Sequence, residues 1–216
     1  NDLNHCIFCP GGIYNFKIQE LNYVTEECPR ALQSSALALD AGCGVGVYSS
    51  MLTHKGYHTI GLDVSSGMLK KAKSLFDEEN VSFVRGSITN LPFKRGKFDV
   101  ILCVDTLHHL TNSHFTRALN EFARVIRPHG LLVSDTRNAL NPFLWIRCRL
   151  INRKWAERGG LTVMARSLKY VEKRLKERRF KPVKVKCINL SRINRAVGLI
   201  APYIVVIARA CGMPER

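Results

Sequence analysis

Short apolar segments alternate with amphipathic segments along residues 36–136, and this alternation predicts strands and helices in turn. The apolar segments are nearly continuous, as is typical of strands that are buried on both faces of a parallel sheet. They are residues 36–40, 58–63, 81–85, 98–104 and 131–135. Between them apolar residues recur at helical spacing, as in the set Met68, Leu69, Ala72, Leu75 and Phe76. Strands joined by helices predict an α/β fold with a parallel sheet covered on both faces.

The pattern changes after Thr136. Residues 137–165 mix aromatic, aliphatic and arginine residues, and this segment is longer than a normal connection between elements. We therefore expect it to be an inserted lid. Residues 1–35 precede the first strand and are expected to form an N-terminal cover segment.

The C-terminal part returns to regular structure. Ser167 predicts the start of an amphipathic helix, and residues 182–188 and 203–209 predict a closing pair of strands. With the five strands before them, these make seven strands. Residues 36–216 are thus predicted to form a single domain.

A glycine-rich loop joins the first predicted strand to the first predicted helix. Its glycines are Gly42, Gly44 and Gly46, and Asp40 stands two residues before the first of them. A dinucleotide site has the spacing G-x-G-x-x-G, and its backbone cradles a pyrophosphate, whereas here the third glycine comes one residue earlier. An upstream carboxylate would repel phosphate and would suit an ammonium group. The loop therefore favours a ligand with a nucleoside, an amino acid and no phosphate, such as S-adenosylmethionine.

Asp63 lies at the end of the second predicted strand, 21 residues beyond Gly42. An acidic residue in this place can bind the two hydroxyls of a ribose. The alternative is that Asp63 caps the helix that follows. Because the glycine-rich loop precedes Asp63 at the distance expected for such a site, the ribose role is favoured.

Five motifs occur in order and at characteristic spacing between residues 36 and 136. Together they resemble class I S-adenosylmethionine-dependent methyltransferases, most closely the small-molecule branch that includes the ubiquinone and menaquinone biosynthesis methyltransferases. The resemblance implies a Rossmann-like, doubly wound and mostly parallel seven-stranded sheet with an antiparallel last strand. The motifs are Asp40-Ala-Gly42-Cys-Gly44-Val-Gly46, Gly61-Leu-Asp63-Val-Ser65-Ser-Gly67-Met68-Leu69, Phe98-Asp99-Val100, Leu107-His108-His109-Leu110 and Arg127-Pro128-His129-Gly130-Leu131.

The resemblance also implies which residues bind S-adenosylmethionine. The loop of Asp40, with Cys43 between the glycines Gly42, Gly44 and Gly46, would hold the methionine and ribose end. Asp63 would bind the ribose hydroxyls. The residues that would contact the adenine are Val64, Met68, Ser87 and Ile88, and those beside the methionine portion are Cys103 and Val104.

Two details qualify these implied contacts. Many relatives have Asp where this chain has Ser87, so the contact to the adenine amino group is expected to be weaker or to come from the backbone of Ile88. Tyr14 or Tyr23 of the N-terminal segment could close over the cofactor, as N-terminal aromatic residues do in relatives.

His108 and His109 follow the fourth strand, at the edge where the methyl acceptor should lie. An imidazole that titrates near neutrality could remove a proton from a hydroxyl acceptor. The alternative is that these histidines shape the pocket or cap the next helix. Asp105, Asp135 and Arg137 are further candidates for facing the acceptor.

The formal net charge of +16 favours an anionic partner. Residues 147–186 contain fifteen Lys and Arg against three Glu. Mixed with apolar residues, this composition suits an anionic membrane surface, and we expect a small or lipid-like methyl acceptor. The alternatives are an RNA methyltransferase that uses the basic segment as a phosphate track, a non-catalytic S-adenosylmethionine-binding partner of another protein, and a merely solvated basic face.

Eight scattered cysteines suit a reducing, cytoplasmic compartment better than a disulfide framework. No apolar run is long enough to span a membrane, and residues 1–10 lack the pattern of a secretory signal. We therefore expect a cytoplasmic protein, peripheral to a membrane if its acceptor is a lipid. Cys6 and Cys9 have metal-ligand spacing and Cys28 could join them, but a second close pair is missing, so no metal is predicted.

Overall fold

The computed structural model describes residues 12–33, 35–76, 79–142, 144, 146, 148, 163–188 and 203–212. Strands alternate with helices over much of residues 37–138, as the apolar pattern predicts, although no helix lies between the third and fourth strands. In chain order they are α1 (Gly12–Glu27), β1 (Leu37–Ala41), α2 (Val47–His54), β2 (His58–Asp63), α3 (Ser66–Leu75), β3 (Val81–Arg85), β4 (Phe98–Cys103), the 3₁₀ turn η2 (Leu107–His109), α4 (Asn112–Val125), β5 (Ile126–Asn138), β6 (Ala165–Arg166), α6 (Leu168–Lys176), β7 (Phe180–Ile188) and β8 (Tyr203–Ala210).

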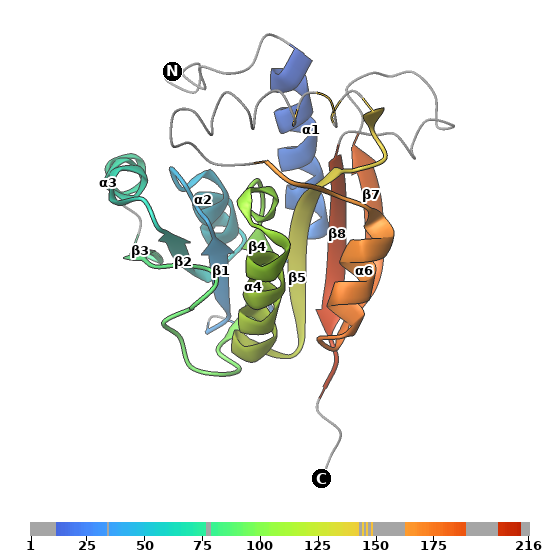
Figure 1. Cartoon of the computed structure of the whole chain (residues 1–216). Helices are drawn as coiled ribbons and strands as arrows, with labels where there is room; N and C mark the ends of the chain where they lie inside the picture. The colour runs from blue at the N-terminus through green and yellow to red at the C-terminus, as the bar shows by residue number, and fades with distance from the viewer. Residues whose placement is uncertain are drawn as a thin grey trace.

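The strands form one twisted sheet in the order β3-β2-β1-β4-β5-β8-β7 (Figure 1). Neighbours from β3 to β5 are parallel, and β8 lies antiparallel to both β5 and β7. This confirms the doubly wound, mostly parallel sheet with an antiparallel last strand. The sheet has eight strands rather than seven, because the two-residue β6 pairs with the end of β5.

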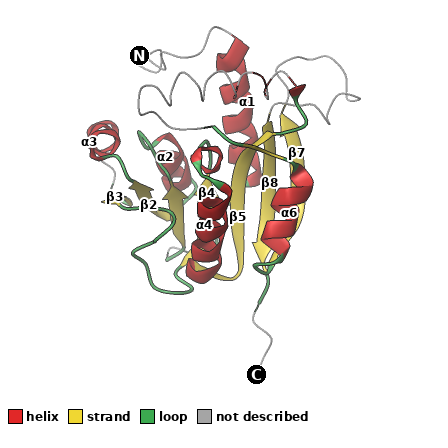
Figure 2. Cartoon of the chain, in the orientation of Figure 1, coloured by secondary structure: helices red, strands yellow, loops and turns green. Residues whose placement is uncertain are grey.

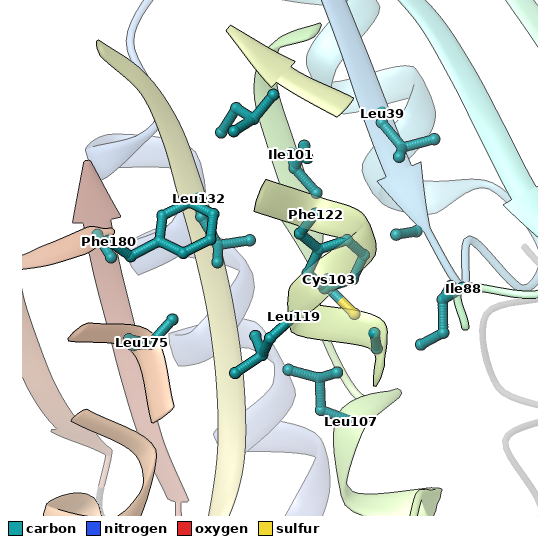
Figure 3. Close-up of a cluster of buried hydrophobic side chains, with 14 of the residues drawn as sticks. Leu39, Ile88, Ile101, Cys103, Leu107, Leu119, Phe122, Leu132, Leu175 and Phe180 are labelled. Carbon is teal, nitrogen blue, oxygen red and sulfur yellow. The ribbon is translucent and has the colours of Figure 1, made fainter. Parts of the chain in front are cut away.

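Two apolar layers hold the helices against the sheet. On one face α4 and α6 pack through Phe115, Phe122 and Leu175 against side chains such as Ile101 and Leu132 (Figure 3). On the other face α1 and α2 pack through residues that include Val24 and Leu52 against alternate residues of the same strands, among them Val100, Leu102 and Val133. The continuous apolar strands are thus buried from both sides, as their composition requires.

The carboxyl ends of β1, β2, β4 and β5 lie at the same edge of the sheet, because these strands are parallel (Figure 2). Ligands of open α/β sheets bind at this edge, where the strand order reverses. Here it reverses between β1 and β4.

The N-terminal cover is helical where it is described, since α1 begins at Gly12. Tyr23 lies on this helix, whereas the side chain of Tyr14 is outside the described part. Most of the predicted lid, like Cys6 and Cys9, also lies outside the described residues. None of the helices described is long and apolar enough to cross a membrane.

Candidate functional site

The glycine loop after β1 has an open backbone conformation that only glycine adopts easily. Gly42, Gly44 and Gly46 have φ values of 87°, 53° and 86°. A Cβ on Gly42 would lie 2.3 Å from Oγ1 of Thr106, and one on Gly46 would lie 2.9 Å from the ring of Phe83. By contrast, nothing lies within 4 Å of a Cβ built on Gly44. The middle glycine therefore faces open space in which a ligand could lie against the main chain.

Asp63 is fixed against this loop. Its Oδ2 accepts a hydrogen bond from the N–H of Gly44 at 3.0 Å, and its Oδ1 accepts one from the N–H of Ser65 at 2.8 Å. The helix α3 is capped by Ser65 instead, whose hydroxyl accepts from the N–H of Met68. The N-cap of α3 is therefore Ser65 and not Asp63. Each carboxylate oxygen of Asp63 can still accept a further hydrogen bond.

Asp40 lies beneath the loop rather than on its surface. The side chain is 2% exposed and accepts a hydrogen bond from the hydroxyl of Ser49 at 2.7 Å. Burial raises the pKa of Asp40 to about 7, against the opposing effect of the Ser49 hydrogen bond, and the negative charge of Asp63 adds to the rise. A cation bound nearby would favour the ionised form.

The residues predicted to contact adenine divide into two groups. Val64 and Met68 are large apolar side chains that are 63% and 48% exposed beside Asp63. Ile88 is buried, and the hydroxyl of Ser87 lies 2.9 Å from that of Thr89 in a tight turn. Exposed apolar side chains next to a carboxylate form a suitable surface for a nucleoside.

Cys103 and Val104, the residues predicted to lie beside the methionine portion of the cofactor, are more deeply buried than residues that line a binding site would be. Cys103 points into the apolar layer beneath α4 (Figure 3), and Val104 joins the layer on the opposite face. Only the backbone of these residues could therefore face a ligand. Cys43 is also buried, and this burial raises the pKa of its thiol well above the ordinary value.

His108 and two carboxylates meet at the ends of β4 and β5. His108 is 1% exposed, and a ring nitrogen lies with oxygens of Asp105 and Asp135 within 4.8 Å of one another. The N–H of Asp105 donates to Oδ1 of Asp135 at 2.7 Å, and Asp105 has a φ of 57°. Non-glycine residues in this conformation are uncommon and cluster at functional sites. Two carboxylates and one imidazole could hold a proton or a divalent cation.

Arg137 approaches the other side of the same imidazole. Its Nη2 lies 3.4 Å from Nε2 of His108, and its guanidinium stacks on the ring of Tyr203 and donates to the hydroxyl of that residue. His109 lies against His108 with ring centroids 4.2 Å apart, and it is less buried. The structure thus places His108 between acidic and basic groups.

Further residues join this region that the sequence patterns did not indicate. The pKa of the Tyr48 hydroxyl is raised far above its usual range by burial, and next by the charges of Glu20, Asp105, Asp135 and Asp40. Glu20 lies on α1 and is fully buried. Negative charge therefore converges where β1, β4 and β5 end, and a cofactor with a sulfonium and an ammonium group would complement it.

Comparisons with known proteins agree with the geometry. A family model described as a methyltransferase domain matches residues 39–134. The chain is 36% identical over 97 residues to an uncharacterised protein of Methanocaldococcus jannaschii, covering 45% of this chain and 39% of that protein. It is 39% identical over 108 residues to phthiotriol/phenolphthiotriol dimycocerosates methyltransferase 1 of Mycobacterium ulcerans, covering 48% and 39%. The chain thus spans about two fifths of the length of these relatives.

Solved structures share the fold at lower identity. An S-adenosylmethionine-dependent methyltransferase of Mesorhizobium loti has a TM-score of 0.70 at 18% identity, over 88% of this chain and 97% of its own. Geranyl diphosphate methyltransferase in complex with S-adenosylmethionine has a TM-score of 0.70 at 14% identity, over 91% and 86%. A chain of the Haloferax volcanii complex that contains the Trm112 methyltransferase activator has a TM-score of 0.73 at 16% identity, over 95% and 94%. These likenesses confirm the predicted fold, and two of these neighbours are themselves described with S-adenosylmethionine.

Proposed function

We propose that this chain, whose residues 39–134 match a methyltransferase domain, is a class I S-adenosylmethionine-dependent methyltransferase that transfers the methyl group of its cofactor to a lipid-like acceptor. The observation that carries the proposal is the position of His108, which lies with Asp105 and Asp135 at the carboxyl edge of the sheet. The cofactor loop opens at this same edge. A proton acceptor and an activated methyl group would therefore meet there.

The cofactor would lie across the loop between β1 and α2. Its amino acid end would face the buried carboxylates, and its ribose would bind to Asp63, which the N–H of Gly44 already orients. Its adenine would cover Val64 and Met68, whose exposure this would reduce. The open space at Gly44 and the exposed apolar pair are the features into which such a ligand fits.

The bound cofactor supplies a methyl group on a positively charged sulfur, which is already a good leaving group. The protein then has to orient the acceptor in line with the sulfur–carbon bond and exclude water. A general base is needed if the acceptor is a hydroxyl.

His108 is suited to that role. Nη2 of Arg137 lies 3.4 Å from Nε2 of His108, and a guanidinium has donors and no acceptor, so this contact favours the tautomer in which Nε2 carries a lone pair. A neutral imidazole can accept the proton of an acceptor hydroxyl. Asp105 and Asp135 would then stabilise the imidazolium that forms.

Three observations support a lipid-like acceptor. The mycobacterial relatives at 39–40% identity are methyltransferases of phthiotriol and phenolphthiotriol dimycocerosates. Leu140 and Ile146 are exposed just beyond the end of β5. A row of exposed lysines on α6, Lys169, Lys173 and Lys176, could approach anionic headgroups. A cytoplasmic protein that rests on the membrane surface would satisfy all three.

The same lysine row favours one alternative, an RNA methyltransferase that uses it as a phosphate track. A third possibility belongs to another class, a cofactor-binding partner without transferase activity. It is motivated by the structural neighbour from a complex with a methyltransferase activator. An accessory protein could equally be needed for activity.

One labelling experiment distinguishes the lipid methyltransferase, the RNA methyltransferase and the non-catalytic partner. The purified chain is incubated with methyl-labelled S-adenosylmethionine and either a cellular lipid extract or total RNA. The expected result is label in the organic phase, which depends on Asp63 and is lost in the Asp63→Ala variant. Label in RNA would favour the alternative enzyme, and cofactor binding without any labelled product, also in the presence of a cell extract, would favour the non-catalytic partner.

A further inference from the structure

We propose that Arg166 is a positioning residue that holds the turn η2, and with it His108, in place for methyl transfer. The inference builds on the proposed function, since it concerns the same site. Arg166 lies in β6, beyond the predicted lid, and stands 58 positions after His108 in the sequence.

The guanidinium of Arg166 binds the turn on both sides of His108. Nη1 donates to the carbonyl oxygen of Leu107 at 3.1 Å, and Nη2 donates to that of Leu110 at 2.5 Å. Nε donates to Oδ1 of Asn112 at 3.2 Å, at the start of α4. The guanidinium also lies over the ring of Phe115, 4.4 Å from its centroid. One side chain thus ties both ends of the turn to the helix that follows.

The backbone next to Arg166 adds a further bond. The N–H of Met164 donates to the carbonyl oxygen of His108 itself, at 2.7 Å. Arg166 in turn pairs with Asn138 of β5, and its carbonyl oxygen accepts from the N–H of Ala139. Residues 164–166 therefore connect the turn to the end of β5.

The turn depends on these outside contacts because it has few bonds of its own. Within it, the N–H of His109 bonds to Thr106 and that of Leu110 bonds to Leu107. It also follows Asp105, whose left-handed backbone costs on the order of 1 kcal/mol and persists only where the surroundings impose it. Arg166 is part of those surroundings.

The charge of Arg166 is unusual for a side chain that is 3% exposed. Burial lowers its pKa, and among the described residues no carboxylate forms an ion pair with it. Backbone carbonyls and an aromatic face compensate the guanidinium instead. An apolar residue would avoid this desolvation cost. It would also remove the donor to the carbonyl oxygen of Leu110 and leave that of Leu107 with only its bond from the N–H of Leu110, so the guanidinium stabilises the geometry of the turn.

Both ends of the predicted lid meet at this turn. Arg137, at its start, reaches Nε2 of His108, and Arg166, just after its end, binds the flanking carbonyls. Arg137 and Arg166 thus hold His108 and its turn from two segments that are far apart in the sequence.

The test compares Arg166→Met with Arg166→Lys and with a matched control, Arg124→Met. Arg124 likewise donates from Nη1 and Nη2 to two loop carbonyls, those of Phe93 and Leu91, but this loop lies away from His108. Amide hydrogen exchange is followed in peptides covering residues 104–112 and 89–95. It needs no acceptor, so it reports on the turn even if the proposed function is wrong.

We expect faster exchange at residues 104–112 in Arg166→Met, partial protection in Arg166→Lys, and faster exchange only at residues 89–95 in Arg124→Met. Where a methylated product is found, kcat should fall about 10- to 100-fold in Arg166→Met, because a small misplacement of the base is costly. The dissociation constant of S-adenosylmethionine should change less than about threefold. Arg124→Met should keep its kcat.

Unchanged exchange at residues 104–112 in a folded Arg166→Met variant would overturn the proposal. So would an equal loss of kcat in Arg124→Met, which would show a general effect on stability. If Arg166→Met fails to fold, Asn112→Ala removes only the Nε partner and should raise exchange in the same peptide. An unchanged turn in that variant and in Arg166→Lys would equally contradict a positioning role.

Discussion

The carboxylate of Asp63 and the backbone N–H of Gly44 are joined by a 3.0 Å hydrogen bond, which links the end of β2 to the loop after β1. The bond brings the predicted ribose-binding acid against the glycine that faces open space. Two segments that are 19 residues apart thus form one binding surface. The first two predictions test the two halves of this pair.

Replacing Asp63 by Ala should weaken S-adenosylmethionine binding strongly while the fold stays intact. The variant loses the bonds to the ribose and the bond that orients Gly44, and hydrogen bonds to a charged group contribute about 1.5–3 kcal/mol each. We therefore expect at least a tenfold to hundredfold rise in the dissociation constant by calorimetry. Asp99→Ala is the control, since Asp99 binds Arg127 and the N–H of Leu37 elsewhere and should affect only stability. Unchanged affinity in Asp63→Ala would refute the ribose assignment.

Replacing Gly44 by Ala should affect ligand binding more than stability. Gly44 and Gly96 have similar φ values, 53° and 59°, and a Cβ on either would meet nothing within 4 Å. Both Ala variants should therefore lose about 1 kcal/mol of unfolding free energy from backbone strain. Only Gly44→Ala should weaken cofactor binding, because its methyl group would occupy the ligand's space. Equal affinities in the two variants would show that the ligand does not lie against Gly44.

Much of this surface could be predicted from the sequence, because it follows from local patterns and from the rule that parallel strands end at one edge. Such cases are the glycine spacing, Asp63, Asp105 just after β4, and Asp135 near the end of β5. The bounds of β2 and β3 agree with the predicted 58–63 and 81–85. Strand β5 is longer than the predicted 131–135, since it begins directly after α4 at Ile126 and ends at Asn138.

Other features depend on contacts that no local pattern records. Strand β6 has only two residues, too few for any periodicity. Arg166 stands in a strongly basic segment and resembles its solvated neighbours until its burial is known. Glu20 likewise looks like an ordinary polar residue of an amphipathic helix, and its approach to Tyr48 is seen only when α1 packs on the sheet.

The raised pKa of Asp40 predicts how stability and cofactor binding vary with pH. Between pH 4 and pH 7 the folded state retains a proton that the unfolded chain has lost, so the unfolding free energy should fall as pH rises through this window. In Asp40→Asn, which can still accept a hydrogen bond from Ser49, this fall should be reduced. Denaturant titrations at pH 4.5, 6 and 7.5 measure it, and an equal slope in both proteins would contradict the assignment.

Cofactor affinity should change in the opposite direction. A ligand with sulfonium and ammonium charges favours the ionised form of Asp40, so affinity should rise by up to about tenfold between pH 6 and pH 8. Calorimetry near pH 6.5 in two buffers of different ionisation enthalpy should show proton release on binding. Asp40→Asn should bind more weakly and with less dependence on pH. Proton uptake on binding would argue against a cationic group beside Asp40.

The lysine row on α6 should determine binding to anionic membranes. Lys169, Lys173 and Lys176 lie on one exposed face of the helix, while Val171 and Leu175 are buried beneath it. Each lysine near an anionic surface contributes about 1 kcal/mol, so replacing all three by Gln should weaken binding to phosphatidylserine vesicles by about 2–3 kcal/mol.

The control for this prediction replaces Lys70, Lys71 and Lys73, which are exposed on α3 at the other end of the sheet. It lowers the net charge equally, so it corrects for long-range attraction. Vesicle co-sedimentation at two salt concentrations should show a clear loss only for the α6 variant. If both variants lose the same affinity, the attraction comes from net charge alone. If the α6 variant loses RNA binding but keeps vesicle binding, the basic face serves a nucleic acid, and the lipid-like acceptor loses one of its supports.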